Sequence, residues 1–157
     1  MLSLDNAFEP EDLYDFEKRT FNKIKKQTLF YSCEPKIDGV AVSLIYEKGK
    51  FIKAGTRGDG EQGEDITHNV KTIKQIPLML NGKNHPDKIE IRGEIYCEKT
   101  AFDKFNKEYA KSGQKTFANP RNFVAGSIRQ LNPEIAAARP LKIQLHSLGY
   151  VDQKNFF

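Results

Sequence analysis

The sequence Cys-Glu-Pro-Lys-Ile-Asp-Gly at residues 33–39 runs directly into Val-Ala-Val-Ser-Leu-Ile at residues 40–45. The second segment alternates apolar and small or polar side chains with a period of two, which predicts a half-buried strand. Extending that alternation backward would place Glu34, Lys36 and Asp38 on one side of the chain. Two interpretations remain open for these seven residues alone: a salt-bridged strand end, or a lysine that carries chemistry.

The chemical interpretation makes Lys36 a nucleophile. A nucleophilic amine must lose its proton near neutral pH, although the unperturbed pKa of a lysine is about 10.4. A neighbouring cation or burial favours the neutral amine, whereas Glu34 and Asp38 favour the charged one. Such a site needs another positive group, which a basic residue, a metal ion or the substrate complex would supply.

Composition predicts a soluble, globular chain. Its 157 residues suffice for one domain with a core, or for part of a larger one. Hydrophobic residues make up 38% and charged residues 29%, which does not fit the disordered class. No apolar run approaches the roughly 20 residues of a membrane helix. A net charge of +4 fits contact with a polyanion, although many ordinary enzymes share it.

The N-terminus and the cysteines bear on the compartment. Residues 1–6 lack the basic start and apolar centre of a signal peptide. Cys33 and Cys97 are too few for a disulfide framework, and their spacing is not that of a metal site. We therefore expect a reduced, cytoplasmic setting without membrane contact, and we assign no metal-ligating residue.

Periodicity and turn residues predict an α+β fold that is rich in antiparallel strands. Pro10 should open a helix with an apolar stripe that runs to Ile24, because acids in the first turn and proline at its start favour that position. Further helices are expected at Thr67–Ile76, from a Thr100 cap to Lys111, and from Arg121 to Arg129. Strands are expected at Thr28–Glu34, Val40–Tyr46, Phe51–Gly55, Lys88–Tyr96 and Lys142–Val151.

The ten residues 56–65 combine three glycines, one arginine and four acids. Such a loop lets its backbone approach a ligand closely, but a generic surface loop fits as well. The acids do not follow the spacing of an EF-hand calcium loop. Arg57 stands where the preceding strand ends and is a candidate for the cation that Lys36 requires.

Three further residues are candidates for ligand contact. Glu94 follows Gly93 in a strand whose alternation places Glu90, Arg92 and Glu94 on the polar face, and a glycine there often marks close approach by a ligand. Arg121 and Arg129 flank a helix rich in small residues, where they are either solvated or bind phosphate.

Taken together, these segments resemble the adenylation domain of the NAD-dependent DNA ligases of bacteria. The resemblance is carried by five ordered motifs, namely Ser-Leu-Asp-Asn-Ala-Phe (3–8), Cys-Glu-Pro-Lys-Ile-Asp-Gly (33–39), Thr-Arg-Gly-Asp-Gly to Gly-Glu-Asp-Ile-Thr (56–67), Arg-Gly-Glu (92–94) and Asn-Pro-Arg-Asn to Ser-Ile-Arg-Gln-Leu (119–131). It implies a nucleotidyltransferase fold that is incomplete at its C-terminal side. The whole of 1–157 would then be a partial adenylation domain, without the preceding domain that binds nicotinamide mononucleotide and without the later domains.

The resemblance also implies roles for individual residues. Lys36 would attack the adenylyl phosphorus of NAD and become lysyl-AMP, after which AMP passes to a 5′-phosphate and an adjacent 3′-hydroxyl seals the nick in DNA replication and repair. Arg121 and Arg129 would contact the phosphates of nicked double-stranded DNA. Mg²⁺ would assist, and the protein would act as a monomer. The residues implied to bind the nucleotide are Ser3, Leu4, Glu34, Asp38, Gly39, Arg57 and Glu94.

The chain departs from the family pattern in two respects. Later motifs with lysines that contact adenine and phosphate are missing, and Phe123-Val124 replaces small residues between Arg121 and Gly126. We therefore expect a fragment that is inactive alone; the alternative is a non-catalytic remnant or a module that binds nicked DNA. A relative that uses ATP or caps RNA shares Lys-x-Asp-Gly, but the segments at 56–60 and 119–122 argue against it.

Overall fold

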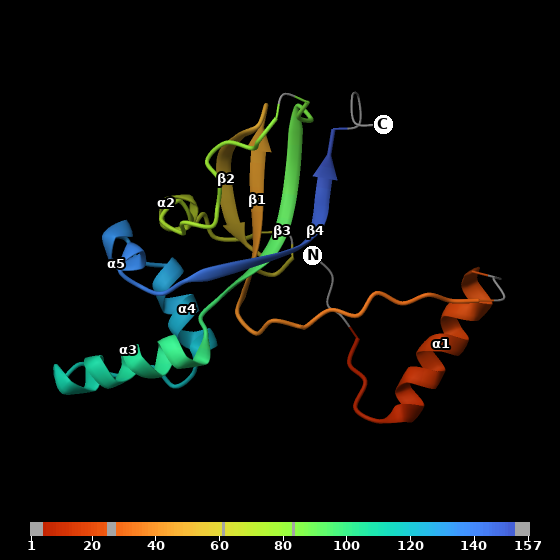
Figure 1. Cartoon of the computed structure of the whole chain (residues 1–157), viewed down its shortest axis with the longest axis horizontal. Helices are drawn as coiled ribbons and strands as arrows, with labels where there is room; N and C mark the ends of the chain where they lie inside the picture. Colours follow the sequence, from red (N-terminus) through yellow and green to blue (C-terminus); the bar gives the residue numbers. More distant parts are fainter. Residues whose placement is uncertain (1–4, 25–27, 61, 83, 153–157) are drawn as a thin grey trace. The chain divides into compact units, whose positions relative to one another are not determined.

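The computed structural model describes residues 5–24, 28–60, 62–82 and 84–152. The chain divides into two units, Met1–Lys36 and Ile37–Phe157. In the first unit the described element is helix α1, Pro10–Ile24 (Figure 1). The carboxylate of Asp12 accepts hydrogen bonds from the backbone N–H groups of Phe8 (2.8 Å) and Glu9 (3.1 Å), which stabilises the start of the helix. The expected helix is thus confirmed, and no residue of α1 is buried.

The strand expected at Thr28–Glu34 is wrong, because these residues have no regular secondary structure. A strand is stable when its backbone groups pair with a neighbouring strand. The described part of the first unit contains one helix and no second strand that could provide this pairing. Pro35 also lacks the N–H group that a ladder requires.

The second unit is built on a four-stranded antiparallel sheet with the order β2-β1-β3-β4 (Figure 1). The strands are β1 (Val40–Glu47), β2 (Lys50–Thr56), β3 (Lys88–Tyr96) and β4 (Lys142–Val151). Lys48 and Gly49 join β1 to β2 with φ angles of 48° and 76°. Two positive φ angles in a two-residue turn are typical of a tight hairpin. The antiparallel α+β fold is confirmed.

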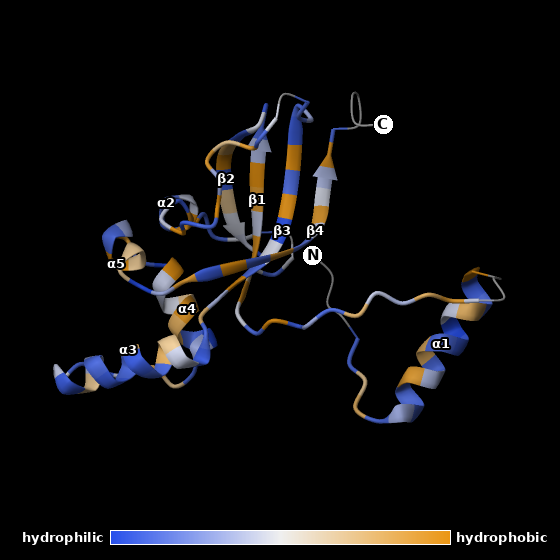
Figure 2. Cartoon of the chain, viewed as in Figure 1, coloured by the Kyte–Doolittle hydropathy of each residue, from blue (hydrophilic) through white to orange (hydrophobic). Residues whose placement is uncertain are grey.

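The register separates the two faces of the sheet. Val42, Leu44 and Tyr46 are at most 1% exposed and form the centre of the apolar core. On the other face, Ser43 pairs with Arg92. The alternation of hydrophobic and hydrophilic residues is visible along β3 in Figure 2. Glu90 accepts hydrogen bonds from the Ser43 hydroxyl (2.7 Å) and from Nε of Arg92 (2.8 Å). The predicted polar face of β3 is therefore correct.

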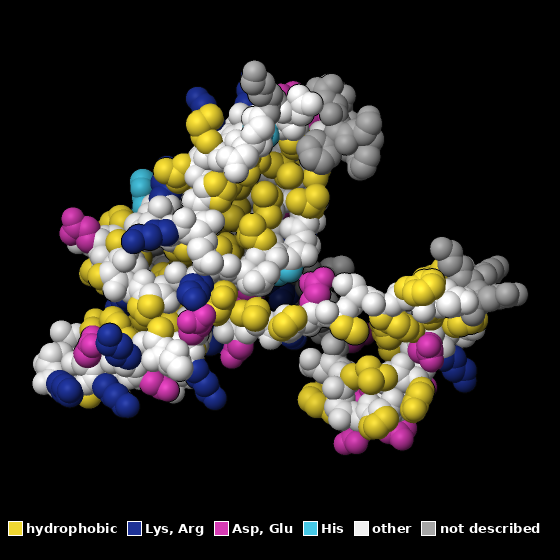
Figure 3. All heavy atoms as spheres, in the orientation of Figure 1, with side chains coloured by type: hydrophobic (Ala, Val, Ile, Leu, Met, Phe, Trp, Pro, Cys, Tyr) yellow, Lys and Arg dark blue, Asp and Glu magenta, His cyan; other side chains and the backbone are white. Residues whose placement is uncertain are grey.

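Helices α2 (Thr67–Val70) and α4 (Pro120–Ile128) pack on the sheet and cover part of its apolar face. Helix α3 (Lys99–Lys111) packs on α4, and α5 (Pro133–Ala137) packs on α2 and α4. Helix α4 contributes the fully buried side chains of Phe123, Val124 and Ile128. The cover is incomplete, since Leu145 and Leu148 on the same face of β4 stay 42% and 56% exposed, and hydrophobic side chains gather over the sheet in Figure 3.

Both α4 and α5 start with an Asn-Pro pair. The side chain of Asn119 accepts a hydrogen bond from the Asn122 backbone N–H (2.8 Å), and that of Asn132 accepts one from Glu134 (2.9 Å). Asparagine at the cap and proline in the first turn are a strong start signal. Helix α4 therefore begins one residue before the predicted Arg121, and the same signal would have predicted α5, which the sequence reading missed.

The helix expected at Thr67–Ile76 is too long, because α2 ends at Val70 and turns follow. The hydroxyl of Thr72 donates to the backbone carbonyl of Asn69 (2.7 Å), which competes with continuation of the helix. Ile73 and Ile76 are nevertheless buried as the pattern predicts. The expected Thr100 cap is also wrong, since α3 begins at Lys99 with Glu98 in the cap position.

Candidate active site

The segment Cys33–Gly39, called the lysine motif below, begins in the first unit and continues into the second. Glu34 and Lys36 lie in exposed backbone without regular structure, and the Ser32 hydroxyl donates to the Glu34 carboxylate (3.2 Å). The strand starts at Val40, so the strand from which the alignment of Glu34, Lys36 and Asp38 was expected does not extend back to these residues. Pro35 within this segment removes a ladder donor. Ser3 and Leu4 fall outside the described residues.

Gly39 lies against β3 within the second unit. Its backbone N–H donates to Oε1 of Glu94 (3.2 Å), and Glu94 is half-buried. A Cβ atom at Gly39 would overlap the backbone carbonyl of Ile95, which cannot turn aside as a flexible side chain could. The motif therefore requires glycine for close packing, and the structure joins two of the predicted site residues directly.

Asp38, also in the second unit, contacts helix α4. Its Oδ1 lies 3.0 Å from Nη1 of Arg121, in the first turn of α4. The two side chains are 76% and 62% exposed, respectively. An ion pair with this exposure contributes about 0–1 kcal/mol to stability. The contact thus places a predicted DNA-binding residue beside Asp38 without making either residue a main support of the fold.

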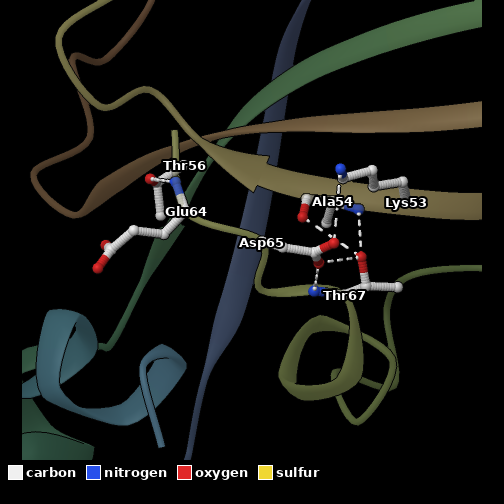
Figure 4. Close-up of polar contacts among 6 residues, drawn as sticks. All are labelled: Lys53, Ala54, Thr56, Glu64, Asp65 and Thr67. Atoms are coloured by element: carbon white, nitrogen blue, oxygen red, sulfur yellow. Dashed lines mark hydrogen bonds and ion pairs between the residues drawn. The ribbon is translucent and has the colours of Figure 1, made fainter. Parts of the chain in front are cut away.

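The glycine-rich loop leaves β2 at Thr56 and returns at Glu64. The backbone N–H of Thr56 donates to the Glu64 carbonyl, and the Glu64 N–H donates to the Thr56 hydroxyl, both at 3.0 Å (Figure 4). Arg57 is fixed at the loop's start by its N–H, which donates to the carbonyl of Ala41 in β1 (3.1 Å). The predicted loop is confirmed, with its two ends held side by side.

Two glycines are required inside this loop. Gly58 has a φ angle of 55°, and a Cβ there would overlap the carbonyl of Gln62. Gly63 lies against the Thr56 carbonyl in the same manner. Close backbone approach within the loop, rather than approach by a ligand, is therefore one demonstrated reason for these glycines.

A second clamp fastens the loop to β2 just beyond Glu64. The Thr67 hydroxyl accepts from the Ala54 N–H (2.9 Å) and donates to Asp65 (2.6 Å), and the Thr67 N–H also donates to Asp65 (3.0 Å) (Figure 4). Nζ of Lys53 lies 3.5 Å from the Asp65 carboxylate. These donors lower the pKa of Asp65 below its ordinary value, the Thr67 hydroxyl bond having the largest effect and Lys53 a smaller one.

This clamp should give stability a defined pH dependence. The folded-state pKa of Asp65 is lower than the unfolded value of about 3.9, so its contribution is fully present above that value and is lost as pH falls through the folded-state pKa. We expect Asp65→Asn to lower the thermal midpoint at pH 7 by a few degrees, because a largely exposed group contributes about 1 kcal/mol or less. Thermal unfolding between pH 7 and pH 2 measures this.

The matched control for that prediction is Asp103→Asn, which neutralises an exposed carboxylate on α3. We expect the gap between parent and Asp65→Asn to narrow toward zero at the acidic end. A gap of constant size across the whole pH range would mean that Asp65 does not act through its charge.

Arg129 follows the end of α4 and pairs with the glycine-rich loop. Its Nε lies 2.5 Å from Oε2 of Glu64. The side-chain amide of Asn69 donates to the carbonyls of Ile128 and Gln130, both at 2.7 Å, on either side of Arg129. Sequence reasoning missed Glu64 and Asn69. Glu64 had a signal as one of four acids in the loop, whereas a buried asparagine in a short helix had none.

Whether these side chains suit a metal ion depends on which other ligands, such as substrate phosphates, bind the same ion. Within residues 5–24, 28–60, 62–82 and 84–152, no group of three or more His, Cys, Asp or Glu side chains could hold one. Mg²⁺ is commonly bound by one or two carboxylates together with substrate phosphates and water. The described residues could therefore hold Mg²⁺ only together with substrate phosphates and water. In the same ranges, no helix is both long and apolar enough to cross a membrane.

Comparison with known proteins shows the family of this chain. The family model of the NAD-dependent DNA ligase adenylation domain matches residues 1–156. A DNA ligase of Hahella chejuensis is 54% identical over 155 residues, and one of Marinomonas sp. is 51% identical over 152; each alignment covers 97% of this chain. A Coxiella burnetii DNA ligase is 50% identical over 157 residues, which is 99% of the chain. The chain spans 23% of the length of each of these relatives. It belongs to the family of NAD-dependent DNA ligase adenylation domains.

Proposed function

We propose that this chain carries the adenylation chemistry of an NAD-dependent DNA ligase that seals nicks in double-stranded DNA. The observation that carries the proposal is the position of Lys36 within Cys33–Gly39, in a chain that the family model matches from residue 1 to residue 156. The relatives named DNA ligase support the same reading.

In the proposed first step, Lys36 acts as the nucleophile. Nζ of the neutral amine attacks the adenylyl phosphorus of NAD, and an N–P bond forms. The P–O bond to nicotinamide mononucleotide breaks, and that oxygen keeps the electron pair. The proton of the amine passes to solvent or to a base. Phosphoryl transfer of this kind depends mainly on positioning and on neutralising the charge that develops.

The remaining residues would position the nucleotide. Glu94 would accept from a sugar hydroxyl with its carboxylate, one oxygen of which already holds the Gly39 N–H. Arg57 would neutralise phosphate charge from a backbone anchored on Ala41. Asp38 would complete the lysine motif, while Ser3, Leu4 and Glu34 would line the base. Mg²⁺, bound mainly through the phosphates, would supply further charge neutralisation.

The proposal is tested with the chain alone and with a chimera. The chimera is the Hahella chejuensis DNA ligase in which the matching 155-residue segment is replaced by this chain. Each is incubated with NAD and Mg²⁺, and its intact mass is measured. An AMP-sized adduct on the chimera supports the proposal, and an adduct on the chain alone would also show that the fragment is competent. A chimera that folds but never gains the adduct would contradict it.

Arg121 should act after the adenylate has formed. We expect Arg121→Ala in the chimera to leave lysyl-AMP formation within about 3-fold of the parent, because its exposed ion pair with Asp38 contributes only about 0–1 kcal/mol. Transfer of AMP to the nick should fall about 10-fold or more, since a charge-assisted contact to phosphate is lost. Single-turnover assays of the two steps separate these effects.

The matched control is Arg19→Ala, which removes an arginine from α1. It should change neither step. Equal loss of both steps in Arg121→Ala would show that the arginine serves the lysine motif through Asp38 instead of serving the DNA.

A further inference from the structure

The ion pair between Arg129 and Glu64 uses one edge of the guanidinium. Nε of Arg129 donates to Oε2 of Glu64, and the two side chains are 55% and 57% exposed. Among the described residues, Glu64 is the partner of the Arg129 guanidinium. Both terminal amino groups therefore remain available for a ligand. A guanidinium can bind phosphate through two parallel N–H donors, so a contact through Nε leaves a usable fork.

Both partners of this pair stand on fixed backbone. Glu64 is tied to Thr56 by hydrogen bonds of 3.0 Å in each direction, and Thr56 is itself buried (Figure 4). The carbonyls on either side of Arg129 accept from the side-chain amide of Asn69, which is 6% exposed. The pair joins residues 65 positions apart in sequence. These bonds fix the backbone of Glu64, so its carboxylate extends toward Arg129 from an anchored position, and the pair restricts the rotamers of the long arginine side chain.

Stability alone does not account for this arrangement, since an exposed pair contributes little. We propose that Glu64 is a positioning residue that orients the guanidinium of Arg129, so that its terminal amino groups meet a phosphate of the nicked DNA. The proposal rests on the proposed function, in which Arg129 binds phosphate. Ordering the side chain before the DNA arrives reduces the entropy lost on binding.

Because Glu64 is negatively charged, its loss of charge and its loss of positioning should change DNA affinity in opposite directions. Removal of a negative charge near a phosphate site should by itself strengthen DNA binding. Loss of orientation should weaken it. Glu64→Gln and Glu64→Ala change the net charge equally, but the glutamine oxygen still accepts from Nε of Arg129, whereas alanine cannot. The difference between these two variants therefore isolates positioning from charge.

The experiment uses the full 157-residue chain carried in the chimera. Affinity is measured for two nicked duplexes that differ only in a 5′-phosphate or a 5′-hydroxyl at the nick. We expect Glu64→Ala to bind the phosphorylated nick about 2- to 10-fold more weakly than Glu64→Gln, the range that follows from one side chain losing its order. Binding to the 5′-hydroxyl nick should be equal for the two variants. A purely structural role for Glu64 would not change this discrimination.

Two further variants separate the ways in which the proposal could fail. If Arg129→Ala leaves the preference for the 5′-phosphate unchanged, the phosphate role of Arg129 is wrong and the inference falls with it. If Arg129→Ala removes the preference, but Glu64→Ala binds the phosphorylated nick as tightly as Glu64→Gln or more tightly, only the inference is overturned. Should Glu64→Ala fail to fold, Glu64→Asp takes its place, because it retains the charge but has a shorter side chain. It should bind the phosphorylated nick more weakly than the parent by a similar factor. Unchanged phosphate binding in Glu64→Asp would overturn the inference.

Discussion

Replacing Lys36 with alanine is expected to abolish the AMP adduct in the chimera, with a loss of more than about 1,000-fold, because no other group supplies the bond to phosphorus. Lys36 lies in exposed backbone outside any helix or strand. The substitution should therefore remove the reaction without a large change in stability. Intact mass after incubation with NAD and Mg²⁺, together with the thermal midpoint of the same sample, measures both quantities.

Two controls accompany this variant. Lys107→Ala removes an exposed lysine from α3 and should retain the full adduct. Lys36→Arg keeps a positive charge, but a guanidinium stays protonated and cannot act as the nucleophile, so it should fail as alanine does. If an AMP adduct persists in Lys36→Ala at the parent level, the nucleophile is another residue and the central proposal is wrong.

Much of the sheet follows from local patterns. Lys88–Tyr96 and Lys142–Val151 form strands with the predicted bounds, because each has the alternation or β-branched residues that suit a half-buried strand. The hairpin at Lys48-Gly49 joins two such strands, and Gly49 adopts its positive φ angle without steric cost. In these segments the local preference agrees with the tertiary environment.

The failures occur where distant residues decide the outcome. Thr28–Glu34 has strand-like composition, but composition cannot show whether a partner strand lies beside it. The early end of α2 depends on side-chain bonds of Asn69 and Thr72, which a periodic pattern does not contain. For the candidate site, the sequence motifs suffice to propose the residues as a set. Their pairing of Asp38 with Arg121 and of Glu64 with Arg129 joins segments more than sixty residues apart and required the fold.

Phe123 is part of the core of the second unit. Its side chain is fully buried on α4, at a position where the resemblance implied a small residue. Its ring centroid lies 5.9 Å from that of Phe102, 4.8 Å from that of Phe105 and 5.1 Å from that of Phe117. The guanidinium of Arg139 lies 5.4 Å from the same ring. The aromatic side chain thus packs α4 against α3 and the segment that precedes α4, and it provides a face for a cation.

Truncation of this side chain should therefore have the largest effect on stability among the variants considered. We expect Phe123→Ala to lower the free energy of unfolding by about 3–5 kcal/mol, because it removes buried apolar area and leaves a cavity between rigid rings. Leu131→Ala is the control, since Leu131 is fully exposed and should change stability by about 0.5 kcal/mol or less. Equilibrium urea unfolding of the two variants and the parent gives the comparison. A loss below about 1 kcal/mol for Phe123→Ala would mean that the neighbouring rings close over the space, and that the aromatic cluster is not what holds α4 in place.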